Sequence, residues 1–222
     1  FKGEGEGRFA KATRIQHADG SDVNVGKAAA SFAVDWDEDG DLDLLVGDIR
    51  GHVWLVPGES KGFGTPAKLK AGGQEIRVPG GDAGPFVHDW NGDGVRDLLV
   101  GCGNGEVHLY AGVQDRSGKG YLLAGAKQLV AKGAYQRSVD ALERGGRAKI
   151  CVADWNADGQ MDLLLGDYAS MMGKQPKLTP EQEAEKAELQ QLQREQRLRF
   201  SRHYTALRSK IHSPPRTIAA AD

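Results

Sequence analysis

Three nine-residue segments, 35–43, 89–97 and 154–162, carry oxygen-bearing side chains at positions 1, 3, 5 and 9. Each segment has glycine at position 6 and is followed by two leucines, a valine or leucine, and a glycine. Alternate side chains of so short a loop can converge on one point, and Ca²⁺ takes about six to eight oxygen ligands. The glycine permits the sharp reversal that wraps the chain around an ion. We therefore predict about three calcium-binding loops.

The predicted ligands are the side chains at positions 1, 3, 5 and 9, with the residue at position 7, which can add a backbone carbonyl. They are Asp35, Asp37, Asp39, Asp41 and Asp43 in the first loop, Asp89, Asn91, Asp93, Val95 and Asp97 in the second, and Asp154, Asn156, Asp158, Gln160 and Asp162 in the third. The first loop has the most carboxylates, so we expect it to bind most tightly. Mg²⁺ fits less well because it prefers a tight octahedron with retained waters. None of the predicted ligands is Cys or His, which argues against zinc and other soft-ligand metals.

Two alternatives are weighed against these sites. An EF-hand needs a glutamate at position 12, but the residues there are Val46, Val100 and Leu165, inside strand-like runs. The loops could instead be acidic turns that cap strands without a metal. That interpretation is disfavoured because so many neighbouring carboxylates would repel one another without a cation.

The residues around the loops predict short antiparallel strands. One apolar run enters each loop and another leaves it; the entering runs are 31–34, 85–88 and 150–153. Two more runs follow in the first two repeats, at 52–56 and near 67–70, then at 106–110 and 127–130. Four such strands per unit are typical of a β-propeller blade. The loops are 54 and 65 residues apart, a period typical of arrays and propellers.

These residues resemble the FG-GAP or VCBS repeat family, the calcium-loop β-propellers related to the N-terminal domain of integrin α chains. The resemblance rests on the tripled pattern D-x-D/N-x-D-G-x-x-D-L-L-x-G, and the segment 62–66, Gly-Phe-Gly-Thr-Pro, is similar to the motif that names the family. It implies an all-β fold, a partial β-propeller of four-stranded antiparallel blades with calcium ligands at the positions given above. We count two full blades and half of a third, and we expect residues 1–15 to form the last strand of a preceding blade.

We divide the chain into blades over residues 1–170, a long amphipathic C-terminal α-helix over 178–212, and a tail over 213–222. Thr179 is the predicted N-cap, Pro180 the first helical residue, and Gln182 the partner that completes a capping box. The helix should end near Ile211. Its interrupted apolar stripe favours packing on its own propeller over docking to a partner or a coiled coil.

Composition narrows the function classes. The formal net charge of −2 over 222 residues shows no excess of basic residues, which argues against a nucleic-acid-binding protein. No apolar run approaches the length that spans a bilayer, so no membrane span is predicted. Cys102 and Cys151 are expected to be small buried hydrophobic residues, and tryptophan at position 2 of each loop is expected to pack. The stretch from 132 to 147 reads as a longer loop. The chain begins inside a repeat without an initiator methionine, so we expect a processed or truncated piece.

The sequence therefore predicts a calcium-binding, non-catalytic binding or adhesion module of an extracytoplasmic protein, whether extracellular, periplasmic or at the cell surface. A protein or glycan ligand would bind loops on the propeller face. One alternative is the propeller portion of a carbohydrate-active enzyme such as a polysaccharide lyase, with His108, Tyr110 and Arg137 as the nearest candidate residues. Another is a structural subunit that docks through its helix.

Overall fold

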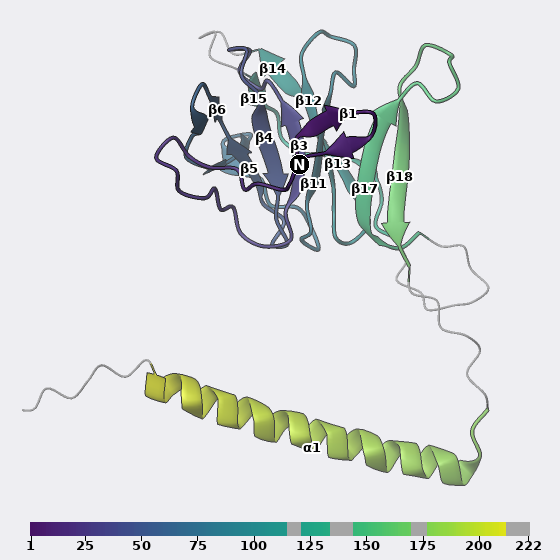
Figure 1. Ribbon diagram of the computed structural model, residues 1–222. Helices are drawn as coiled ribbons and strands as arrows, with labels where there is room; N and C mark the ends of the chain where they lie inside the picture. Colours follow the sequence, from purple (N-terminus) through teal and green to yellow (C-terminus); the bar gives the residue numbers. More distant parts are fainter. Residues whose placement is uncertain (115–120, 134–143, 170–176, 212–222) are drawn as a thin grey trace, which may run out of the picture. The chain divides into compact units, whose positions relative to one another are not determined.

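Two four-stranded antiparallel sheets are built around the first two loops (Figure 1). The first sheet has the strand order β3 (Ala30–Val34), β4 (Asp43–Gly47), β5 (Val53–Val56) and β8 (Ala67–Lys68). The second sheet has the order β11 (Gly84–His88), β12 (Asp97–Gly101), β13 (Val107–Tyr110) and β16 (Lys127–Val130). The four strands predicted for each of these repeats are confirmed.

A third, two-stranded sheet pairs β17 (Gly146–Ala153) with β18 (Asp162–Tyr168). The computed structural model describes the chain except for residues 115–120, 134–143, 170–176 and 212–222. Part of the loop predicted over 132–147 therefore lies outside the described residues, as does the predicted tail. The predicted end of that loop, at residue 147, is wrong, because Gly146 and Arg147 already belong to β17.

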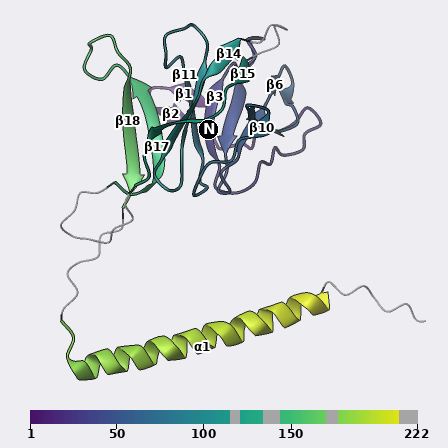
Figure 2. The ribbon, with the colours of Figure 1, turned by 180° about the vertical axis from the view of Figure 1, so that it is seen from behind.

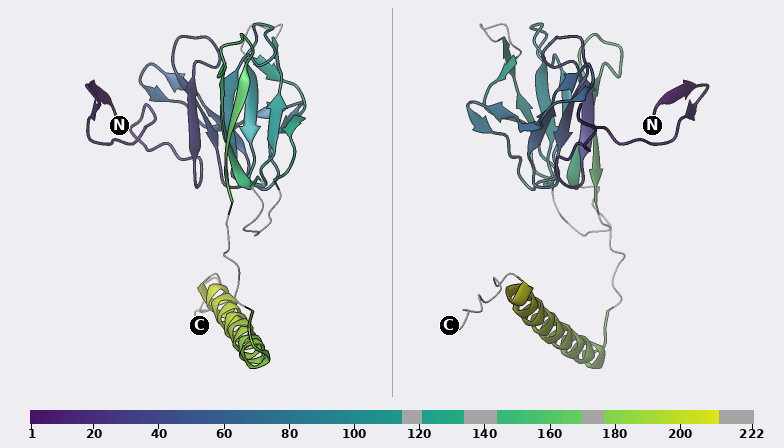
Figure 3. Two further views of the ribbon diagram at one scale, coloured as in Figure 1. Left: turned by 90° about the vertical axis from the view of Figure 1, so that its right-hand side faces the viewer. Right: turned by 60° about the vertical axis from the view of Figure 1, so that its left-hand side comes forward.

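Short hairpins complete the unit Phe1–Gly173. They pair β1 (Gly3–Gly5) with β2 (Arg8–Phe9), β6 (Gly58–Glu59) with β7 (Gly62–Phe63), β9 (Lys70–Ala71) with β10 (Gln74–Glu75), and β14 (Gly112–Gln114) with β15 (Tyr121–Leu123). The N-terminal segment is thus a hairpin and not the single strand that was predicted (Figure 3). Its residues include three glycines with polar neighbours, so local turn formation takes precedence over extension.

The second sheet lies between the first sheet and β17–β18 (Figure 2). Every residue of β12 is buried, as expected for a strand covered on both faces. The rings of Phe32 and Phe86 lie 4.8 Å apart between centroids and join β3 to β11. The largest core cluster includes Leu45, Val53, Leu98 and Val100.

The glycines that end the first two Leu-Leu runs have a packing reason. A Cβ atom on Gly47 would overlap the carbonyl oxygen of Ala83, and one on Gly101 would overlap that of Ala148. At both positions the backbone at the start of the next sheet crosses directly over the strand. A Cβ on Gly166 would lie 3.8 Å from its nearest neighbour, Lys149 O, which is ordinary contact. Within the described residues, no further sheet follows β18 to close that space.

The tryptophans at loop position 2 show the same difference: the first two are covered by a neighbouring sheet and the third is not. Trp36 is 4% exposed in the main core, and Trp90 packs beside Leu99 and Val152 in a second cluster. Trp155 is 76% exposed. The predicted packing role is confirmed for the first two and wrong for the third. Cys102 is buried as predicted, whereas Cys151 is exposed, and both are free thiols.

The second unit, Lys174–Asp222, contains the helix α1 (Pro180–Ile211). The predicted capping box is present: Thr179 N donates to Gln182 Oε1 at 3.0 Å, and Gln182 N donates to Thr179 Oγ1 at 3.3 Å. The described side chains of α1, through residue 205, are exposed. Over the described residues, no helix combines the length and hydropathy needed to cross a membrane. Packing of α1 on the sheets of its own chain and docking of α1 to a partner both stay predictions.

Candidate metal centres

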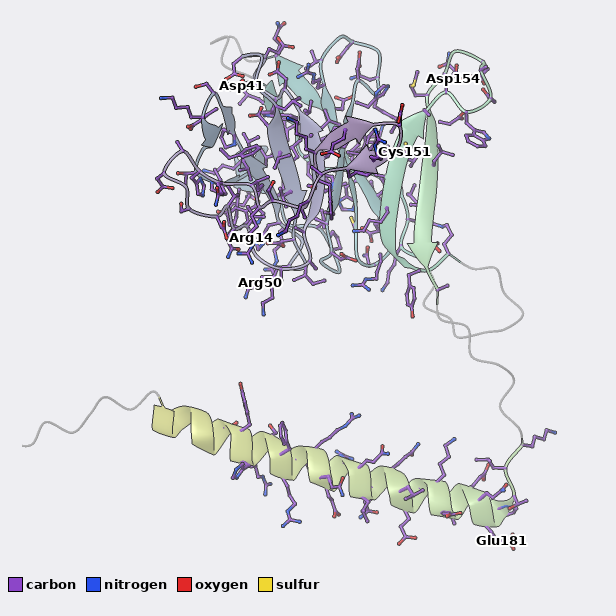
Figure 4. The ribbon with its side chains drawn as sticks, in the orientation of Figure 1. Arg14, Asp41, Arg50, Cys151, Asp154 and Glu181 are labelled. Carbon is purple, nitrogen blue, oxygen red and sulfur yellow. The ribbon has the colours of Figure 1, made fainter. Side chains whose placement is uncertain are left out.

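The three acidic loops occupy equivalent places in their sheets, each joining the first strand to the second. The residue before position 1 pairs with the residue at position 9 in every case: Val34 with Asp43, His88 with Asp97, and Ala153 with Asp162. Because the register is shared, corresponding loop residues fall at corresponding points of each hairpin. Asp41 of the first loop and Asp154 of the third lie at the same end of the unit (Figure 4).

Each loop curls at two left-handed residues, at positions 4 and 6. The φ angles are 62° and 96° at Glu38 and Gly40, 74° and 83° at Gly92 and Gly94, and 58° and 86° at Ala157 and Gly159. Glycine at position 6 was predicted from its freedom at positive φ. Position 4 gave no such signal, because its residue type differs in each loop.

Two of the predicted ligand side chains are held by backbone amides in every loop. The position 1 carboxylate accepts the N–H of position 6, at 3.2 Å for Asp35, 2.9 Å for Asp89 and 2.9 Å for Asp154. The position 5 carboxylate accepts the N–H of position 7, at 2.8 Å for Asp39, Asp93 and Asp158. These are the turn hydrogen bonds of the metal-free interpretation. They also preorganise the ligands that a cation would need.

The first loop gathers three carboxylates with an unsatisfied oxygen. One ligand atom each from Asp35, Asp37 and Asp39 lies within 4.8 Å of the others. Asp35 Oδ1 is buried and has no hydrogen-bond partner. A buried acceptor without a partner is costly, and three clustered carboxylates repel one another. Burial, with the charges of Asp39, Asp43 and Asp35, raises the pKa of Asp37 above its usual range. A hard cation with oxygen ligands fits this donor set.

The second and third loops differ at position 3, where asparagine replaces aspartate. Asn91 Nδ2 donates to Asp93 Oδ2 at 2.8 Å, and Asn156 Nδ2 donates to Asp158 Oδ2 at 2.9 Å. An amide donor relieves part of the repulsion that the first loop retains. The stronger binding expected of the first loop stays a prediction.

Position 9 has a role that the sequence did not indicate. Asp97 is fully buried, and its two oxygens accept Trp90 N at 2.9 Å and Gly112 N at 2.7 Å. Asp43 does the same with Trp36 N at 2.7 Å and Gly58 N at 2.6 Å. This carboxylate clamps the start of its own loop to the hairpin that follows the third strand. Its identification as a metal ligand stays a prediction.

We expect the clamp to stabilise the fold without calcium. Asp97→Asn removes the charge and turns an amide N–H₂ toward a backbone donor, so it should lower the free energy of unfolding by about 2 kcal/mol. Asp162 accepts only Trp155 N, at 2.9 Å, among the described residues and lies at the exposed third loop. Asp162→Asn is the matched control, with an expected loss below about 1 kcal/mol. Urea unfolding in calcium-free buffer measures both, and equal losses would contradict the clamp.

The two enzymatic candidates that the structure describes, His108 and Tyr110, do not form an open acid–base site. His108 Nε2 lies 2.7 Å from Glu106 Oε2, with both side chains 14% exposed. Tyr110 is 5% exposed, and burial together with the Cys102 side chain raises its pKa to about 12, which makes it a poor base near neutral pH. Arg137 lies outside the described residues.

Comparison with protein families gives one match. The model of the FG-GAP-like repeat matches residues 35–100 and again residues 89–165, which together span more than half of the chain. Each match begins at one acidic loop and ends in the strand that follows the next acidic loop. A search of curated proteins found no match.

Proposed function

Because this chain belongs to the FG-GAP-like repeat family, we propose that it is a calcium-stabilised β-propeller module that serves binding and not catalysis. The first and second sheets are two blades, and β17–β18 is half of a third. The family and the antiparallel sheets support the propeller, since radially arranged four-stranded sheets are its building block.

The observation that carries the calcium proposal is the unpartnered, buried Asp35 Oδ1 among three carboxylates. Ca²⁺ would be held by Asp35, Asp37 and Asp39, and by the corresponding residues of the other loops. It would supply the positive charge that offsets their repulsion. The chain itself orients the ligands: turn hydrogen bonds hold the side chains at positions 1 and 5, and the carboxylate at position 9 links the loop to its sheet.

The loops favour an extracytoplasmic location. Weak calcium sites of extracellular modules have dissociation constants of about 10⁻⁴–10⁻³ M and stay filled only where calcium is abundant. The metal then belongs to the scaffold, and a protein or glycan ligand binds the segments that differ between blades.

Calorimetric titration with CaCl₂ tests the proposal directly. We expect a stoichiometry near three per chain, and a fall by about one site in Asp39→Ala, because each loop supplies one set of oxygen ligands and all three loops have aspartate at position 5. Asp22→Asn, which alters an exposed carboxylate paired with Arg14 outside the loops, should leave the stoichiometry unchanged. Absence of calcium binding at millimolar concentration would overturn the proposal.

A further inference from the structure

A cavity of about 540 Å³ lies at the first sheet and takes in the turn after β4. Arg50, in that turn, lies at the opposite end of the unit from Asp41 of the first acidic loop (Figure 4). Three parts of the chain line the cavity: residues 24–27, the turn 48–50, and the side chains of His52, Trp54 and Lys68. A volume of this size is typical of a small-molecule site.

Asp48 organises the wall of the cavity. It is 5% exposed, and its carboxylate accepts Arg50 N at 2.8 Å, His52 N at 3.0 Å and Trp54 Nε1 at 3.0 Å. His52 Nδ1 lies 3.2 Å from Asp48 Oδ2. Burial would raise the pKa of Asp48, but the hydrogen bonds from Trp54, His52 and Arg50 outweigh it and lower that pKa. The carboxylate is therefore ionised at neutral pH and can only accept.

The ionised Asp48 carboxylate determines the tautomer of His52 and the orientation of the Trp54 indole. Since ionised Asp48 offers no proton, His52 Nδ1 must carry the hydrogen, which leaves Nε2 as the ring nitrogen for a ligand. The indole of Trp54 is held by its own N–H and cannot rotate without losing that bond. Both rings are preorganised, which reduces the entropy that a ligand must offset on binding.

Positive charge surrounds these rings. The side chains of Lys27 and Arg50 make no ion pair or hydrogen bond with the rest of the described chain. Lys68 Nζ lies 5.6 Å from the centroid of the Trp54 ring and 2.7 Å from Glu75 Oε2. Among the described residues that line the cavity, Asp48 is the one carboxylate, and it is already saturated with donors. An anionic group would therefore meet cations without meeting a free carboxylate.

The second sheet shows that this chemistry is not part of the scaffold. The residues one repeat later than Asp48, His52 and Trp54 are Cys102, Glu106 and His108. There the polar groups satisfy one another: Glu106 Oε1 accepts Asn104 Nδ2 at 3.0 Å, and Glu106 Oε2 lies 2.7 Å from His108 Nε2. The Leu-Leu-Val-Gly strand is the same in both sheets, so the two repeats share their frame and differ at this end.

We propose that this cavity binds an acidic saccharide, a sugar ring that carries a carboxylate. The inference rests on the proposed function as a binding module and names its ligand class. The Trp54 indole lines the cavity and supplies apolar surface for the sugar ring, while His52 Nε2 and Asn24 supply polar groups for its hydroxyls. Arg50, with its planar fork of donors, and Lys27 meet the carboxylate. A neutral sugar would leave both cations unpaired.

The test uses the full chain, ¹⁵N-labelled in calcium-containing buffer, and digalacturonic acid as the probe. We expect shifts of the Trp54 indole N–H resonance, identified by its loss in Trp54→Phe, and of the amides of residues 24–27. The double variant Lys27→Gln/Arg50→Gln should bind about tenfold more weakly, because two charge-assisted contacts are removed. The matched control Lys61→Gln/Lys127→Gln removes the same charge outside the cavity and should bind within about twofold of the unaltered chain.

Three results would overturn the inference: no shift at about 10 mM probe, where even a millimolar complex is mostly formed; equal binding of the neutral disaccharide with the same linkage; or equal binding by a triglutamate peptide. Melting temperatures with and without calcium are recorded on the same samples. If calcium stabilises the chain but the probe does not bind, the saccharide inference alone fails. If calcium does not stabilise the chain, the proposed function fails.

Discussion

Adding about 10 mM Ca²⁺ to the calcium-free protein should raise the melting temperature of the sheet unit by at least about 10 °C. A site with a dissociation constant near 0.1 mM gains about 2.7 kcal/mol at a hundredfold excess of ligand. For a domain of this size, each kcal/mol corresponds to about 2–4 °C. Two filled loops already reach the expected shift. Tryptophan fluorescence is the appropriate probe, since all four tryptophans lie in the unit Phe1–Gly173.

Mg²⁺ is the matched control for this shift. At the same concentration and ionic strength it should stabilise the unit much less, because it dehydrates reluctantly and prefers an octahedron to a flexible oxygen cage. Asp37→Asn, which weakens only the first loop, should reduce the calcium-dependent shift without abolishing it. A melting temperature unaffected by Ca²⁺ would mean that turn hydrogen bonds alone hold the loops.

Local patterns allowed the strands, loops and helix cap to be predicted. The acidic loops could be predicted because alternate oxygens and a glycine at fixed spacing have one geometric consequence. The helix start could be predicted because Thr179 and Gln182 bond to each other's backbone within one turn. In each case the interacting groups lie within a few residues of one another.

Features that depend on neighbouring sheets could not be predicted. Trp36 and Trp155 have the same sequence context, yet one is buried and the other exposed, because the second sheet covers only the first of them. Cys151 was misassigned for a related reason: it lies in an apolar run, but in a sheet of only two strands. The saturated carboxylate of Asp48 gave no pattern, since its donors form a network only after the turn and β5 have folded together.

The glycine after each Leu-Leu run illustrates the same limit. Its recurrence is read as part of the repeat, but at Gly47 and Gly101 the reason for it is the backbone of the next sheet, which leaves no room for a Cβ atom. Gly101→Ala should therefore destabilise the unit by about 3 kcal/mol, because neither the strand nor the carbonyl of Ala148 can move without disturbing buried β12. The free energy of unfolding in urea measures the loss.

Gly166→Ala is the same substitution at the same repeat position, where the nearest atom to the new Cβ would be 3.8 Å away. It should change the free energy of unfolding by less than about 1 kcal/mol, since glycine in a strand is itself slightly unfavourable relative to alanine. The difference between the two variants isolates sheet-to-sheet contact from strand propensity. Equal losses would show that the glycine serves the strand itself, and a tolerated Gly101→Ala would contradict the close approach of Ala148.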